Sequence, residues 1–83
     1  MADLARTPSQ IGNLIRRARK KRGLSQTKLG EQVGLRQETI SLIETGNAAV
    51  RLDTLLAVLA TLGLEFHIVP RGQRAAVDIE SSL

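Results

Sequence analysis

Apolar residues recur every three or four positions along most of the chain, a spacing typical of amphipathic helices. The first such run begins after Thr7 and Pro8, and threonine followed by proline is a favourable start for a helix. Gly23 follows the run and supplies the left-handed residue that commonly ends a helix. The pattern predicts a first helix from about Pro8 to Arg22. Its apolar face comprises Ile11, Leu14, Ile15 and Ala18.

Two short helices are predicted next, over residues 26–33 and 36–44, with Gly34 between them. Ser25 is a good N-cap for the former, and Thr45-Gly46-Asn47 is typical of a turn that ends the latter. Helices of about two turns need tertiary support. Apolar side chains on one face of each helix can supply this support. They are Leu29 and Val33 in residues 26–33, and Ile40 and Ile43 in residues 36–44.

The strongest periodic signal is the leucine-rich run over residues 51–62, which predicts a fourth helix ended by Gly63. Its leucines have the spacing of a helix that faces a core. They are Leu52, Leu55, Leu56, Leu59 and Leu62.

The period changes from 3.6 to 2 over residues 64–69, where apolar and polar residues alternate before Pro70. This pattern predicts a strand. A lone strand in a helical chain leaves its backbone groups unpaired, so we expect it to pair with the same strand of a second subunit. The predicted fold is mainly α, with four to five helices and a two-stranded intersubunit ribbon. The ribbon's apolar face comprises Leu64, Phe66 and Ile68.

The length of 83 residues fits one domain, which we place at residues 8–70 between flexible ends at 1–7 and 71–83. So short a chain buries only about 60% of the surface that its unfolded form exposes. A homodimer would add useful burial.

The charge balance favours an anionic partner such as nucleic acid. There are 12 Lys and Arg against 8 Asp and Glu, giving a net charge of +4 and a pI near 10.7. Exposed members of the basic cluster in the first helix can contact phosphates, although a solvated helix face is the alternative. The cluster comprises Arg16, Arg17, Arg19, Lys20, Lys21 and Arg22.

The residue types needed for catalysis or metal binding are scarce. Cysteine is absent and His67 is the single histidine, so neither a disulfide nor a ligand cluster is expected. A nucleophile with a base and an orienting acid is also missing. No segment resembles a secretory signal or approaches the roughly 20 apolar residues that span a bilayer. We expect a cytoplasmic protein that is not an enzyme, binds no cofactor or metal and does not enter a membrane.

Two short helices joined by a glycine-containing turn form a helix-turn-helix unit, whose second helix enters the major groove of DNA. Residues 26–43 fit this arrangement. Long polar side chains at the start of the second helix suit base recognition. Its outward-facing residues are predicted to be Arg36, Gln37, Glu38, Thr39 and Ser41.

Gln37 is the best candidate for base recognition, because glutamine can bond to both N6 and N7 of adenine, which discriminates by about 1–3 kcal/mol. Glu38 can accept a hydrogen bond from cytosine N4 or exclude wrong sequences by repulsion. Thr39 and Ser41 can contact a thymine methyl group or a phosphate. For each residue the alternative is an ordinary exposed helical position.

Several motifs together resemble the lambda-repressor/Cro-like (XRE) family over about residues 11–62. The resemblance implies a domain of four or five helices that binds a palindromic operator in double-stranded DNA as a dimer. The motifs are Gly23-Leu24-Ser25-Gln26, Leu29-Gly30, Gly34-Leu35, Thr39-Ile40-Ser41 and Glu44-Thr45-Gly46.

The same resemblance assigns roles to particular residues. It places Ser25 and Gln26 at a phosphate, and it pairs Arg19 with Glu44, joining the first helix to the end of the third. The residues that it places near bases are Gln37, Glu38 and Ser41.

Two positions depart from the family pattern. Arg51 stands where the fourth helix often opens with Pro-Ser, and Gly30 replaces the more usual alanine. Glycine inside a helix costs roughly 1 kcal/mol relative to alanine. We expect close packing of the third helix across Gly30 to compensate.

Residues 62–70, which follow the fourth helix, resemble the HipB-like antitoxins of bacterial toxin–antitoxin pairs, in which the strand forms the dimer ribbon. This resemblance implies a repressor of its own operon, associated with the nucleoid when bound to DNA, that also binds a HipA-like serine/threonine kinase toxin. Two alternatives stay open. The chain can be a stand-alone XRE-type regulator, or a protein-interaction module that neutralises a partner with little role at DNA.

Overall fold

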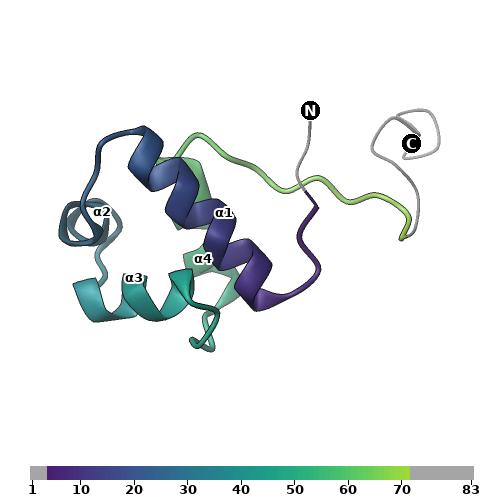
Figure 1. Cartoon of the computed structure of the whole chain (residues 1–83), viewed down its shortest axis with the longest axis horizontal. Coiled ribbons are helices and arrows are strands. Elements are labelled where there is room, and N and C mark those ends of the chain that lie inside the picture. Colours follow the sequence, from purple (N-terminus) through teal and green to yellow (C-terminus); the bar gives the residue numbers. More distant parts are fainter. Residues whose placement is uncertain (1–3, 72–83) are drawn as a thin grey trace.

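The computed structural model describes residues 4–71 of the chain, and four helices account for most of that part (Figure 1). The prediction of a mainly helical fold is confirmed, with four helices and no fifth among these residues. Most of the predicted C-terminal tail, residues 72–83, and the first three residues lie outside the described part. The helices are α1 (Pro8–Lys21), α2 (Gln26–Val33), α3 (Gln37–Glu44) and α4 (Leu52–Thr61).

The core lies where the four helices meet. α3 packs against both α1 and α2, and α2 packs against α4. Each helix contributes one completely buried aliphatic side chain, and burying such a side chain stabilises the fold by about 1.5–3 kcal/mol. These four residues are Ile15, Leu29, Ile40 and Val58.

The helix boundaries follow the local signals in the sequence. The Gln10 N–H donates to the Thr7 hydroxyl at the start of α1 (3.1 Å). Arg36 and Arg51, which the sequence placed inside α3 and α4, are instead their N-cap residues, because both have extended backbone conformations. All four helices end at or next to a glycine of positive φ, namely Gly23, Gly34, Gly46 and Gly63.

The predicted inward face of α4 is partly wrong. Leu55, Leu59 and Leu62 are buried as expected, whereas Leu52 is 65% exposed and Leu56 is 43% exposed. The fully buried Val58 shows the reason. The inward face of α4 is centred on Val58 together with Leu55 and Leu59, and Leu56 lies at the edge of that face. Leu52 occupies the exposed first turn.

The predicted strand over residues 64–69 is absent from the described part of the chain. This segment leaves the helices without regular structure (Figure 1). A strand needs a hydrogen-bonded partner, and within residues 4–71 no backbone hydrogen bond joins residues 65–70 to another described residue. Residues 64–70 are all exposed, so burial does not alternate along the segment. His67 Nε2 lies 2.8 Å from the Glu65 carboxylate, which is a local contact between exposed side chains.

None of the helices within residues 4–71 is long and apolar enough to cross a membrane.

Candidate nucleic-acid interface

The turn between α2 and α3 is built around Gly34. Its φ of 75° lies in the left-handed region that glycine adopts without steric cost. The N–H groups of Gly34 and Leu35 both donate to the Gly30 carbonyl, the latter at 2.8 Å. A Cβ atom on Gly30 would clash with the Leu35 carbonyl oxygen. Close packing across Gly30 is therefore present, but it comes from the turn residue Leu35 and not from α3 itself.

α3 buries one side and presents the other. Ile40 and Ile43 face the core, as their spacing predicts. Exposure is greatest at the N-terminal end of the helix and at one later apolar residue, Leu42, which is 48% exposed. The exposure of Leu42 could have been predicted from the sequence, because Leu42 lies two positions from the inward-facing Ile40 and hence on the opposite side of the helix. Of the predicted DNA-binding residues here, Arg36, Gln37 and Glu38 are exposed and Thr39 and Ser41 are half-buried.

The Ser25 side chain caps α2 and still has a hydroxyl proton that can be donated. Its hydroxyl oxygen accepts a hydrogen bond from the Lys28 N–H at 3.0 Å, which caps α2. The hydroxyl proton remains available, because serine can donate and accept at the same time. The first N–H groups of α2, at Gln26 and Thr27, have no partner within the helix and favour an anion there.

The buried ion pair between Arg19 and Glu44 joins α1 to the last residue of α3. Arg19 Nε and Nη2 donate to the two carboxylate oxygens of Glu44 at 2.6 and 3.1 Å. The two side chains are only 9% and 2% exposed. Arg19 Nη1 also donates to the Leu24 carbonyl at 2.8 Å. One guanidinium therefore ties together α1, the α1–α2 loop and the end of α3.

The approach of α3 to α1 is close because Gly12 lacks a side chain. A Cβ atom at Gly12 would clash with the backbone carbonyl oxygens of Ile43 and Glu44. The backbone at the end of α3 thus rests directly on α1, which brings Glu44 within reach of Arg19.

Two glutamines extend this ion pair to the protein surface. Gln26 Nε2 donates to Glu44 Oε1 at 3.0 Å, and Gln37 Nε2 donates to Gln26 Oε1 at 2.6 Å. Gln26 is half-buried and Gln37 is exposed. Sequence reasoning missed both bonds, because they depend on how the N-termini of α2 and α3 meet across the turn. The predicted phosphate-binding and base-reading residues are thereby hydrogen-bonded to the core.

The residues predicted to form the dimer strand take no part in these hydrogen bonds. Leu64 and Phe66 are exposed, and Ile68 is 90% exposed. All three belong to the segment that follows α4 and has no regular structure (Figure 1).

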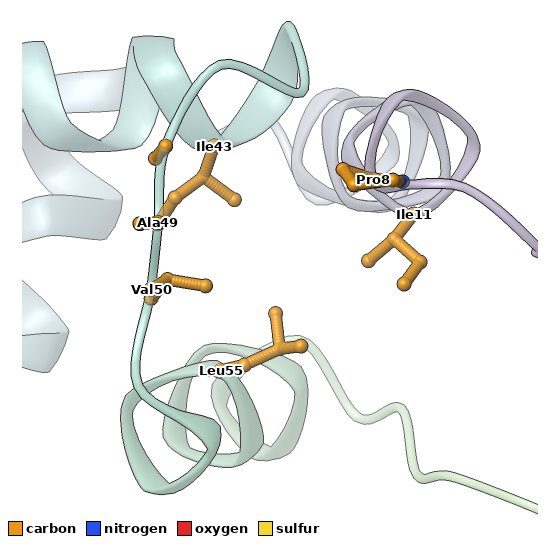
Figure 2. A pocket seen from close by; sticks show the side chains of 7 residues that line it. Pro8, Ile11, Ile43, Ala49, Val50 and Leu55 are labelled. Carbon is orange, nitrogen blue, oxygen red and sulfur yellow. The ribbon is translucent and has the colours of Figure 1, made fainter.

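An apolar pocket of ≈ 310 Å³ lies between the start of α1, the α3–α4 loop and the start of α4. Ile11, Ile43 and Leu55 point toward it from three helices (Figure 2). Its lining residues carry no acid, base, nucleophile or metal ligand. Within residues 4–71 there is also no group of three or more His, Cys, Asp or Glu residues that could hold a metal ion.

The fold and motifs define a class of protein. The family model described as "Helix-turn-helix" matches residues 15–69, more than half of the chain. The chain therefore belongs to the helix-turn-helix family, in its lambda-repressor/Cro-like (XRE) branch. This family consists of DNA-binding regulators and is not an enzyme class.

Particular relatives refine this assignment. The uncharacterized HTH-type transcriptional regulator y4mF of Sinorhizobium fredii is 35% identical over 74 residues, which cover 89% of this chain and 97% of the relative. Antitoxin HipB of Escherichia coli is 31% identical over 62 residues, 75% of this chain and 70% of the antitoxin. A chain of the solved HipA-HipB-O2-O3 complex matches with a TM-score of 0.74 and 26% identity, over 84% of this chain and 99% of that chain. The fold is therefore HipB-like.

Replacing Arg19 should destabilise the protein far more than replacing a neighbouring exposed arginine. Arg19→Met leaves the Glu44 carboxylate buried without its partner, and breaking such a pair costs about 3–5 kcal/mol. Arg16→Met, on the exposed face of α1, should change the free energy of unfolding by less than about 0.5 kcal/mol. Urea unfolding monitored by circular dichroism measures both, and equal effects would contradict a stabilising role for the pair.

Proposed function

We propose that the protein is a sequence-specific DNA-binding transcriptional repressor. The observation that carries this proposal is the hydrogen-bonded connection of Gln37, exposed at the start of α3, through Gln26 to a buried ion pair. A side chain held in this way is preorganised, so less conformational entropy is lost when it meets a base.

In this function α3 lies in the major groove. Gln37 recognises adenine, whereas Glu38 faces cytosine N4 or excludes wrong sequences by repulsion. Leu42, which the structure adds, suits contact with a thymine methyl group. The half-buried Thr39 and Ser41 are positioned for a thymine methyl or a phosphate at the edge of the contact.

The N-terminus of α2 serves as the phosphate contact. The Ser25 hydroxyl proton and the first N–H groups of α2 supply donors. Arg36 and the exposed basic residues of α1 add charge, consistent with the net charge of +4. Such contacts fix the register of a protein on DNA but carry little sequence information themselves.

We also propose that the active form is a homodimer, in which residues 64–69 of two chains form a two-stranded ribbon. The support is the alternating pattern, the apolar exposure of Phe66 and Ile68, and the backbone groups without a described partner. A twofold dimer would place two copies of α3 about 34 Å apart, one turn of DNA, and would match a palindromic operator.

The biological setting that we propose is autoregulation of a toxin–antitoxin operon, with a HipA-like serine/threonine kinase as the protein partner. Two findings support this setting. The relative from Escherichia coli is an antitoxin, and the matching solved chain comes from a complex that contains HipA. A stand-alone regulator is the alternative, and the relative y4mF carries the name of a transcriptional regulator and not of an antitoxin.

Titration against a duplex from the protein's own promoter tests the proposed function. The promoter fragment should bind about a thousandfold more tightly than an unrelated duplex, and log affinity should fall linearly with log salt concentration. Gln37→Ala should remove about 1–3 kcal/mol of the preference for the promoter. Gln32→Ala, on the exposed part of α2, is the control and should have little effect. Equal weak binding to both duplexes would instead favour the protein-interaction module.

Disrupting the proposed ribbon should produce monomers. Ile68→Asp places a charge on the apolar face of the strand, whereas His67→Asp places it on the opposite face. Sedimentation should show a large rise in the dimer dissociation constant for Ile68→Asp, with His67→Asp close to the parent protein. A parent protein that is monomeric at micromolar concentration would contradict the proposed dimer.

A further inference from the structure

The Gln26 amide lies between two groups that constrain its orientation. On one side is the Glu44 carboxylate, which is paired with Arg19 and can only accept hydrogen bonds. The Gln26 NH₂ group must therefore face Glu44, as the 3.0 Å bond from Nε2 to Oε1 shows. The carbonyl oxygen of Gln26 is then directed at Gln37.

The orientation of the Gln26 amide determines the orientation of the exposed Gln37 amide. Gln26 Oε1 is an acceptor, so the group that Gln37 turns toward it must be the NH₂ group, and the distance is 2.6 Å. Gln37 retains one N–H and its carbonyl oxygen for an external partner. An exposed glutamine without such a contact can rotate its amide by half a turn and exchange the positions of donor and acceptor.

We propose that Glu44 is a positioning residue for base recognition, acting through Gln26 to fix which atom of the Gln37 amide donates and which accepts. The inference rests on the proposed function of Gln37. Adenine presents N7 as an acceptor beside the N6 donor, so it requires one donor and one acceptor in a set order. Guanine presents two acceptors, N7 and O6. A fixed amide polarity therefore favours adenine, and a freely rotating amide loses part of that preference.

The same buried pair thus has two separable effects. Arg19 and Glu44 stabilise the packing of α1 against α3, which any purely structural ion pair would also do. A purely structural pair would leave the relative affinities for the four bases unchanged once the protein is folded. Likewise, a Gln26 that acts only at a phosphate would alter affinity for all sequences equally.

The test uses variants that interrupt the connection at different points in the full-length protein. Gln26→Leu removes the intermediate amide and keeps the Arg19–Glu44 pair. Arg19→Met combined with Glu44→Gln removes the carboxylate without leaving a buried unpaired charge. Gln37→Leu identifies the base pair that Gln37 contacts, and Gln32→Leu is a control on the exposed part of α2.

Each variant is titrated at one salt concentration against the promoter duplex and against duplexes with every single base-pair substitution, and its thermal unfolding is measured separately. We expect Gln26→Leu and the double variant to lower the adenine preference by about tenfold at the position identified by Gln37→Leu. Preferences at other positions should persist, and Gln32→Leu should match the parent protein. If the double variant does not fold, the single variant Glu44→Gln replaces it, because the glutamine oxygen can still accept a hydrogen bond from Arg19.

The possible failures are distinguishable. If Gln37→Leu loses the adenine preference but Gln26→Leu or the variant without the Glu44 carboxylate keeps it, the role of Glu44 in recognition is overturned and the proposed function stands. If Gln26→Leu lowers the affinity for all duplexes equally, the role of Glu44 in recognition is likewise overturned. If the parent protein itself shows no preference among duplexes, the proposed function fails, and the inference fails with it.

Discussion

The structure depends on one buried ion pair, between Arg19 in α1 and Glu44 at the end of α3. Buried charges are tolerated only when their hydrogen-bonding capacity is used, and here the guanidinium contacts both carboxylate oxygens and the Leu24 carbonyl. Since the pair joins α1, the following loop and α3, it fixes the helix that carries the residues proposed to read bases. The remaining acceptor capacity of Glu44 holds Gln26. The same ion pair therefore stabilises the fold and orients the surface that we propose for DNA recognition.

That anchor matters because the helices of the unit are short. α2 and α3 have eight residues each, a length at which an isolated helix is marginal in water. Their persistence in the domain comes from packing, from the Ser25 cap and from the tight turn at Gly34. Gly12 and Gly30 permit the backbone contacts that make this packing possible, since a Cβ atom at either position would strike a carbonyl oxygen. A small core thus still yields a rigid frame for recognition.

Much of this fold could be predicted from local features of the sequence. Helical periodicity, the caps at Thr7 and Ser25 and the terminal glycines set the helix positions to within about one residue. Periodicity could not set the rotation of α4, because Leu52 and Leu56 fit the same pattern as the leucines that enter the core. The strand was predicted from alternation alone, and alternation supplies no hydrogen-bonded partner; within residues 4–71 the segment forms no strand.

The site was predicted less completely than the fold. The Arg19–Glu44 pair came from the family resemblance and not from spacing, since 25 positions separate the two residues. The bonds from Gln26 to Glu44 and to Gln37 depend on the angle between helices and on the turn at Gly34, which no local pattern specifies. The exposed Leu42 was predictable, because the inward positions of Ile40 and Ile43 already place it on the outer face.

In our proposal the surface that recognises DNA is already connected to the core in the free protein, through the bonds from Gln37 to Gln26 and from Gln26 to Glu44. Side-chain amide relaxation by nuclear magnetic resonance on the free protein tests it most directly, with Gln26 compared with Gln32 on the exposed part of α2. The hydrogen bonds to Glu44 and Gln37 predict an order parameter for the Gln26 amide of about 0.8, close to that of rigid backbone, and one below about 0.6 for Gln32. A Gln26 amide as mobile as that of Gln32 would contradict the claim.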